Sequence, residues 1–189
     1  MRSLRKYVVM RKLLVLFAAL LATVAPLPSA ADARTAIAVL PLAAADSGLP
    51  YGLLPSRSEL RVMTTQLRSG LGGGGISLVA PERMTRALAA ANFDQTTPSR
   101  SCAAVECARR IGRAVRADTV VVGAVTRAMA VVWSTDFLIV DVATGRVIGE
   151  PRVGYKGDVQ AMELGERDAG VCIARVIRGE KPCPPDPGW

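Results

Sequence analysis

The sequence contains no histidine. This absence excludes serine–histidine and cysteine–histidine catalysis, and it removes the commonest metal ligand. Lysine is also scarce, since beyond residue 33 only Lys156 and Lys181 remain and neither belongs to a serine–lysine pattern. Asp136 and Asp141 are separated by an odd number of positions, so on a regular strand they would face opposite sides. We therefore predict that the protein is not an enzyme and has no catalytic residue.

The chain also lacks an apolar run long enough to cross a bilayer comfortably, although its N-terminal region has the pattern of a signal peptide. Five basic residues precede an apolar run from Leu13 to Val24, and small residues follow up to Ala33. A membrane helix needs about 20 apolar residues. We therefore predict a cleaved signal peptide over residues 1–33, export to the periplasm and no transmembrane anchor after cleavage. The alternatives are an uncleaved anchor and a start at Met10.

Removal of 33 of the 189 residues leaves 156, which is the length of one domain. Of the 24 basic and 16 acidic residues, the leader takes five and one, so 19 and 15 remain, a net charge of +4. This excess is too small to indicate nucleic acid as a partner, but it would tolerate an anionic one. No cysteine lies near the cleavage site, so a lipoprotein is not expected.

The four cysteines are Cys102, Cys107, Cys172 and Cys183. An even number of cysteines in an oxidising compartment predicts two disulfides, and we favour the local pairs Cys102–Cys107 and Cys172–Cys183. Free buried thiols are the alternative. Oxidised cysteines could not form a four-cysteine zinc site, and Gly70 to Gly75 lacks the G-K-[ST] of a phosphate loop. We therefore expect no metal and no cofactor.

The hydrophobic periodicity predicts an α/β fold with the order β-α-β-α-α-β-β-β-α. The predicted strands are residues 35–42, 76–79 and a β-rich stretch from Thr119 to Tyr155, which reads as an antiparallel meander. The predicted helices begin after a Ser56–Glu59 capping box and at Pro81, and two more cover residues 102–116 and 158–178. This order predicts a mixed sheet of about five strands with helices packed mainly on one face. The domain is expected over residues 34–180, with a proline-rich tail over 181–189.

Several local strings accompany this order: Ile37-Ala-Val-Leu-Pro41, Ala117-Asp-Thr-Val-Val-Val-Gly123 and Val140-Asp-Val-Ala-Thr-Gly145. Together they resemble the fold shared by the TolB amino-terminal domain, CsgG and LpoB. With the Cys102…Cys107 pair, the chain also resembles an uncharacterised family of small secreted proteins of Gram-negative bacteria. Members of the TolB, CsgG and LpoB group mostly act as scaffolds that bind other envelope proteins. The lipidation cysteine of LpoB and CsgG, the membrane-inserting segments of CsgG and the propeller of TolB are missing here.

The resemblance implies a non-enzymatic periplasmic accessory protein that binds another cell-envelope protein. The alternative is a periplasmic protein that binds a small ligand between sheet and helices. Arg109, Arg113 and Arg116 have the spacing of one helical face and are the candidate protein-binding residues, unless they form a solvated face paired with Glu106 or Asp118. Trp133 is either a core residue or an interface anchor. The sequence leaves the oligomeric state open.

Overall fold

The computed structural model describes residues 36–48, 53–94 and 105–180. The predicted signal peptide and the predicted tail lie outside these residues, as do Cys102 and Cys183. Within the described ranges, no helix has both the length and the apolar character that a membrane span requires.

The order of the elements confirms the α/β prediction. The strands are β1 (Ala36–Val39), β2 (Ala43–Ala45), β3 (Ser77–Leu78), β4 (Thr119–Met129), β5 (Val132–Asp141), β6 (Val147–Gly149) and β7 (Arg152–Lys156). The helices are α2 (Arg57–Gly73), α3 (Pro81–Ala90), α4 (Val105–Val115) and α5 (Val159–Ile177).

The sheet has seven strands because β2 follows the strand predicted over residues 35–42 and was not predicted, and because the end of the β-rich stretch is divided into β6 and β7. Pro41 lies between β1 and β2, and Pro151 lies between β6 and β7. Proline has no backbone N–H to donate to a neighbouring strand, so it interrupts the ladder. Near the first break, the N–H of Leu42 donates instead to Oγ1 of Thr64 on α2, at 2.9 Å. The two breaks explain the difference from the five strands expected.

The sheet is mixed, as predicted. Its main order is β3-β1-β4-β5-β6, with β2 beside β4 and β7 beside β5. β1 runs parallel to both β3 and β4, whereas β5 is antiparallel to β4, β6 and β7. The predicted antiparallel meander after residue 119 is therefore confirmed.

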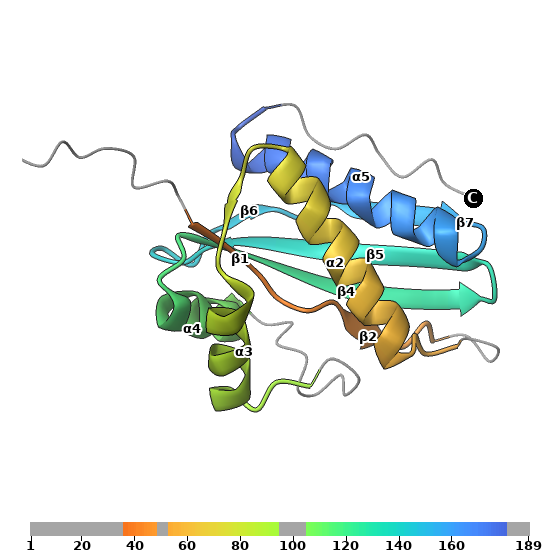
Figure 1. Ribbon diagram of the computed structural model, residues 1–189, viewed down its shortest axis with the longest axis horizontal. Helices are drawn as coiled ribbons and strands as arrows, with labels where there is room; N and C mark the ends of the chain where they lie inside the picture. The colour runs from red at the N-terminus through yellow and green to blue at the C-terminus, as the bar shows by residue number, and fades with distance from the viewer. Residues whose placement is uncertain (1–35, 49–52, 95–104, 181–189) are drawn as a thin grey trace, which may run out of the picture. The chain divides into compact units, whose positions relative to one another are not determined.

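The helices are divided between the two faces of the sheet (Figure 1). Val121 and Val125 of β4 pack in the core beneath α2 and α5, while Val120 and Val122 pack on the opposite side with α4. We expected helices mainly on one face, and the two long helices do share a face, with α3 and α4 on the other. A strand covered on both faces has a continuous apolar sequence, which explains the run of valines in β4.

α2 and α5 approach closely at two glycines. A Cβ atom on Gly70 would lie 2.0 Å from the backbone oxygen of Arg167, and one on Gly170 would lie 2.3 Å from that of Leu67. Only glycine fits at such a contact, so these residues allow the two long helices to pack as one layer. The predicted capping box begins α2, with Ser56 and Glu59 exchanging both hydrogen bonds.

Candidate functional site

Arg109, one of the predicted binding residues, is held by contacts within the domain. Its Nε donates to the carbonyl oxygen of Val142 at 3.2 Å, and one terminal nitrogen donates to that of Ala143 at 3.1 Å. The other terminal nitrogen forms an ion pair with Glu106, and the side chain is only 22% exposed. Arg109 therefore fastens α4 to the turn after β5.

That turn is built by the D-x-x-T-G sequence. Oδ1 of Asp141 accepts hydrogen bonds from the backbone N–H and the hydroxyl of Thr144, both at 2.7 Å. These bonds lower the pKa of Asp141. Gly145 supplies the positive φ of 77° that the turn requires, and a Cβ there would meet Cδ of Arg109 at 3.0 Å.

Arg113 is exposed on α4, but Arg116 does not continue the same face because the helix ends at Val115. The N–H of Ala117 donates to the oxygen of Gly112, and that of Arg116 donates to the oxygen of Arg113. This pair of bonds is a Schellman motif, which places its C′ residue in a left-handed conformation. Arg116 occupies that position with φ of 54°, where glycine is usual. The three predicted arginines thus have different surroundings, and their role in protein binding stays a prediction.

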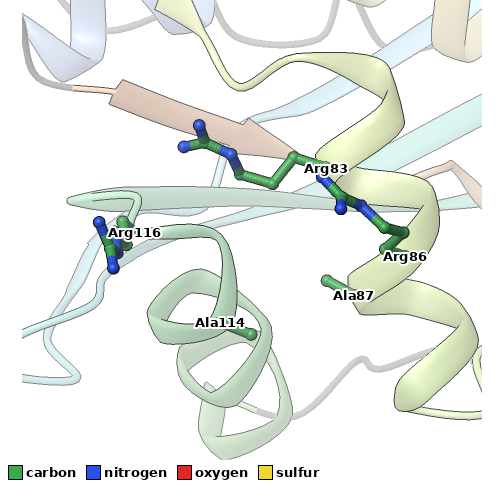
Figure 2. Close-up of a pocket in the computed structure, with 5 residues that line it drawn as sticks. All are labelled: Arg83, Arg86, Ala87, Ala114 and Arg116. Carbon is green, nitrogen blue, oxygen red and sulfur yellow. The ribbon is translucent and has the colours of Figure 1, made fainter.

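Arg116 lines a cleft between α3 and α4, which we call the arginine cleft (Figure 2). The cleft has a volume of about 430 Å³. Its lining residues are Arg83, Arg86, Ala87, Ala114 and Arg116. Sequence reasoning missed Arg83 and Arg86, whose only signal was their spacing of three on a predicted helix. The alternative hypothesis places a ligand between the sheet and the helices, whereas this cleft lies between two helices.

A second surface feature lies at the end of the β4–β5 hairpin. Here the N–H of Leu53 donates to the oxygen of Arg127, and that of Gly157 donates to the oxygen of Val131. These bonds bring three segments to one end of the sheet, next to the start of α5 (Figure 1). The exposed large hydrophobic side chains that these segments carry are called the apolar tip: Leu53, Leu54, Met129, Val131 and Val159.

The apolar tip was not predicted from the sequence. Leu54 and Met129 are the most exposed of its members, at 59% and 60%. The available signal was the presence of two apolar residues, Met129 and Val131, beside the turn between β4 and β5, where polar side chains are usual. Residues 53–54 gave no such signal, because only the tertiary contact with Arg127 brings them to the hairpin.

A buried carboxyl group lies between α5 and the sheet. Glu166 is fully buried, and its Oε1 accepts a hydrogen bond from the hydroxyl of Thr135 at 2.5 Å. Burial raises the pKa of Glu166 to about 8, because desolvation opposes the charged form more than the Thr135 bond favours it. Trp133 on the same strand is also buried, with Arg127 4.2 Å above its ring, so Trp133 is a core residue.

The structure describes two of the four cysteines in the predicted disulfides. Cys107 lies on α4 and Cys172 on α5, whereas Cys102 and Cys183 lie outside the described residues. Because α4 and α5 cover opposite faces of the sheet, Cys107 and Cys172 are too far apart for the Cα separation of about 4–7 Å that a disulfide needs. One of the three possible connectivities is thereby excluded, and the choice between the other two stays a prediction.

Comparison with solved structures shows the fold. The chain is similar to the lipoprotein GNA1162 from Neisseria meningitidis, with 14% identity, a TM-score of 0.51, and coverage of 77% of this chain and 95% of that one. The LpoB C-terminal domain from Salmonella enterica has 18% identity, a TM-score of 0.49, and coverage of 68% and 87%. TolB from Acinetobacter baumannii has 13% identity, a TM-score of 0.40, and coverage of 77% and 28%. Identities this low carry no statement about activity.

Family membership is the more specific finding. No curated protein matches the chain. The family model DUF3280, whose description is "Protein of unknown function (DUF2380)", matches residues 35–162. These residues include every described strand and the first turn of α5. Since this match spans more than half of the sequence, the chain belongs to the DUF3280 family.

Proposed function

We propose that this protein is a non-enzymatic periplasmic accessory protein that binds another protein of the cell envelope through the apolar tip. The observation that carries the proposal is the gathering of exposed hydrophobic side chains. Of the eight large hydrophobic residues exposed among the described residues, five lie at this one end of the sheet. Exposed hydrophobic residues scattered singly are normal, whereas a contiguous group marks an interaction site.

The surroundings of the apolar tip suit a protein interface. Lys156 and Asp158 flank Gly157, whose N–H donates to the oxygen of Val131, and both side chains are exposed. Asp158 also caps α5 by accepting from the N–H groups of Gln160 and Ala161. An apolar centre with a polar rim on rigid elements is the usual anatomy of a protein-binding surface. The hairpin and the helix cap therefore hold the tip in place before a partner arrives.

The titratable groups support a binding role over catalysis. Glu166 is the carboxyl group whose pKa is raised toward neutrality, which is a property of general acids. Its side chain is completely buried between α5 and the sheet, so no substrate could reach either oxygen. Absence of histidine from the whole sequence points the same way. The periplasmic part of the proposal rests on the signal-peptide pattern and on the resemblance to the TolB, CsgG and LpoB group.

Site-specific photo-crosslinking in living cells tests the proposal. A photoreactive amino acid at Met129 is expected to form an adduct of defined mass with one envelope protein. The same amino acid at Val147, which is exposed elsewhere on the sheet, serves as the control and is expected to form none. Equal crosslinking from both positions would contradict docking through the tip.

Substitution gives a second test of the same surface. The triple variant Leu54→Ser, Met129→Ser and Val131→Ser, which carries no photoreactive amino acid, is expected to reduce co-purification of the partner identified by crosslinking by about tenfold or more, because buried apolar contacts dominate such interfaces. The matched control carries Val62→Ser, Val147→Ser and Leu164→Ser, three exposed hydrophobic residues outside the tip. Unchanged recovery with the first variant, in a protein of normal stability, would overturn the proposal.

A further inference from the structure

The arginine cleft gathers positive charge from two separate helices. Arg83 and Arg86 lie one turn apart on α3, and Arg116 follows the last residue of α4. The two other lining residues are alanines, so no acidic side chain is part of the lining. Among the described residues, none of these three arginines forms an ion pair. The cleft therefore holds three cations without a counter-charge of its own.

Two of the arginines are positioned by the end of α4. A terminal nitrogen of Arg83 donates to the carbonyl oxygen of Val115 at 3.4 Å, which draws its side chain across the cleft (Figure 2). This carbonyl belongs to the last turn of the helix, where oxygens lack partners within the helix. The guanidinium retains other N–H groups that this single bond does not use. Arg83 is thereby held near Arg116 with donors to spare.

Arg116 reaches the cleft through its unusual backbone conformation. A left-handed residue at the end of a helix is normally glycine, because a larger side chain is strained in this conformation. The Schellman motif requires this conformation of whichever residue follows α4. Arg116 lines the cleft from that position and does not continue the helical face that carries Arg109 and Arg113. Strain of this kind is found at binding sites more often than elsewhere.

The volume and the charge of the arginine cleft decide which anions fit. About 430 Å³ is enough for a small molecule or a headgroup, and the small side chains of Ala87 and Ala114 leave the centre unfilled. Guanidinium groups bind phosphate with paired hydrogen bonds, and several of them suit a group that carries more than one negative charge. A single carboxylate would neutralise only one of three cations. The chemistry therefore favours phosphate.

We propose that the arginine cleft is a binding site for a phosphate group carried by a small ligand, with Arg83, Arg86 and Arg116 as its ligands. The phosphate group could belong to a soluble phosphoester or to a lipid headgroup, since both present the same oxygens. This site is separate from the apolar tip, so it stands or falls independently of the proposed function.

Titration with inorganic pyrophosphate, followed by nuclear magnetic resonance of the folded domain, tests this site. We expect saturable shifts of the backbone amides of Ala87 and Ala114, with an affinity that falls as salt is added. A parallel arm uses sedimentation with vesicles that contain phosphatidylglycerol. Saturation by pyrophosphate supports a soluble phosphoester, and vesicle binding without it supports a headgroup. The proposal would be overturned if neither pyrophosphate nor the vesicles bound. It would also be overturned if the amide shifts were spread over arginines outside the cleft.

Variants separate the cleft from the general positive charge. Replacing Arg83, Arg86 and Arg116 with glutamine is expected to weaken binding by about tenfold or more. The matched control replaces Arg61, Arg167 and Arg175, which are exposed on α2 and α5, and is expected to bind as the unmodified protein does. Should the triple variant fold poorly, Ala114→Asp keeps all three arginines and introduces a carboxylate beside them. Equal binding by the control triple and the cleft triple, or unchanged binding by Ala114→Asp, contradicts the proposal.

Discussion

The hydroxyl of Thr135 on β5 donates to Oε1 of Glu166 on α5, and both side chains are completely inaccessible to solvent. The other carboxyl oxygen, Oε2, is buried and has no hydrogen-bond partner among the described residues. A charged carboxylate in this position would be poorly solvated, which is why its pKa rises to about 8. Glu166 therefore holds its proton at neutral pH and joins α5 to the sheet as a neutral group.

This relationship predicts that the protein loses stability as pH rises. The unfolded chain releases the proton of a glutamate near pH 4, whereas the folded protein holds it to about pH 8. Folded protein thus binds more protons between these values, so the free energy of unfolding falls by up to about 1.4 kcal/mol per pH unit and levels off above pH 8. Urea unfolding at about pH 5, 6, 7 and 8 measures this slope.

Glu166→Gln is expected to remove that slope, because glutamine remains neutral at every pH. At about pH 8 the variant should be more stable than the unmodified protein by about 2–4 kcal/mol, and near pH 5 the two should be similar. Glu163→Gln on the same helix is the control and should keep the original dependence on pH. A slope that survives in Glu166→Gln would show that another group causes it.

A second prediction concerns the contact between α2 and α5. Gly170→Ala is expected to lower the free energy of unfolding by about 2–4 kcal/mol, since the added Cβ would lie 2.3 Å from a backbone oxygen that cannot move alone. Gly72→Ala in the same helical layer meets no atom within 4 Å and should stabilise by about 0.5–1 kcal/mol. Denaturant unfolding of both variants checks the difference in sign.

Arg109 is expected to contribute to stability, in contrast to Arg113. Arg109→Ala removes two hydrogen bonds to the turn after β5 and should cost about 1–2 kcal/mol, a value reduced by the partial exposure of the ion pair with Glu106. Arg113→Ala, on the exposed side of α4, should change stability by less than about 0.5 kcal/mol. Thermal unfolding of both variants compares them, and equal losses would show that the contacts of Arg109 add nothing.

The disulfide prediction can be tested by peptide mapping of unreduced protein. We expect Cys102 linked to Cys107 and Cys172 linked to Cys183. A Cys107–Cys172 peptide is not expected, because the sheet separates the two helices that carry these residues. Four alkylated cysteines without prior reduction would contradict the prediction and would also weaken the case for export.

Local sequence signals located most of the fold. The Ser56–Glu59 box and Pro81 act through hydrogen bonds or backbone angles within a few residues, and both begin helices as predicted. The D-x-x-T-G string also forms a local turn. The helix predicted to end at Arg116 ends at Val115, one residue earlier. Arg116 therefore does not lie on the same helical face as Arg109 and Arg113. A helix end depends on which residue adopts the left-handed conformation, and the sequence offered no glycine to mark it.

The two candidate sites were less accessible to sequence reasoning. Arg83 and Arg116 are distant in the chain and meet only because α3 and α4 pack on the same face. Leu53 and Met129 likewise share the apolar tip because a backbone bond joins residue 53 to β4. Contacts between distant segments leave no periodic trace in the sequence, so they could not be inferred from spacing.

The amino-acid sequence determined the class of fold, the order of the elements and the absence of histidine chemistry, because these depend on composition and on short-range periodicity. Tertiary structure alone decided that α4 and α5 lie on opposite faces, that Glu166 is buried, and that three arginines share one cleft. The physical reason is that burial and convergence are properties of pairs of segments, which acquire a free energy only when the sheet brings them together.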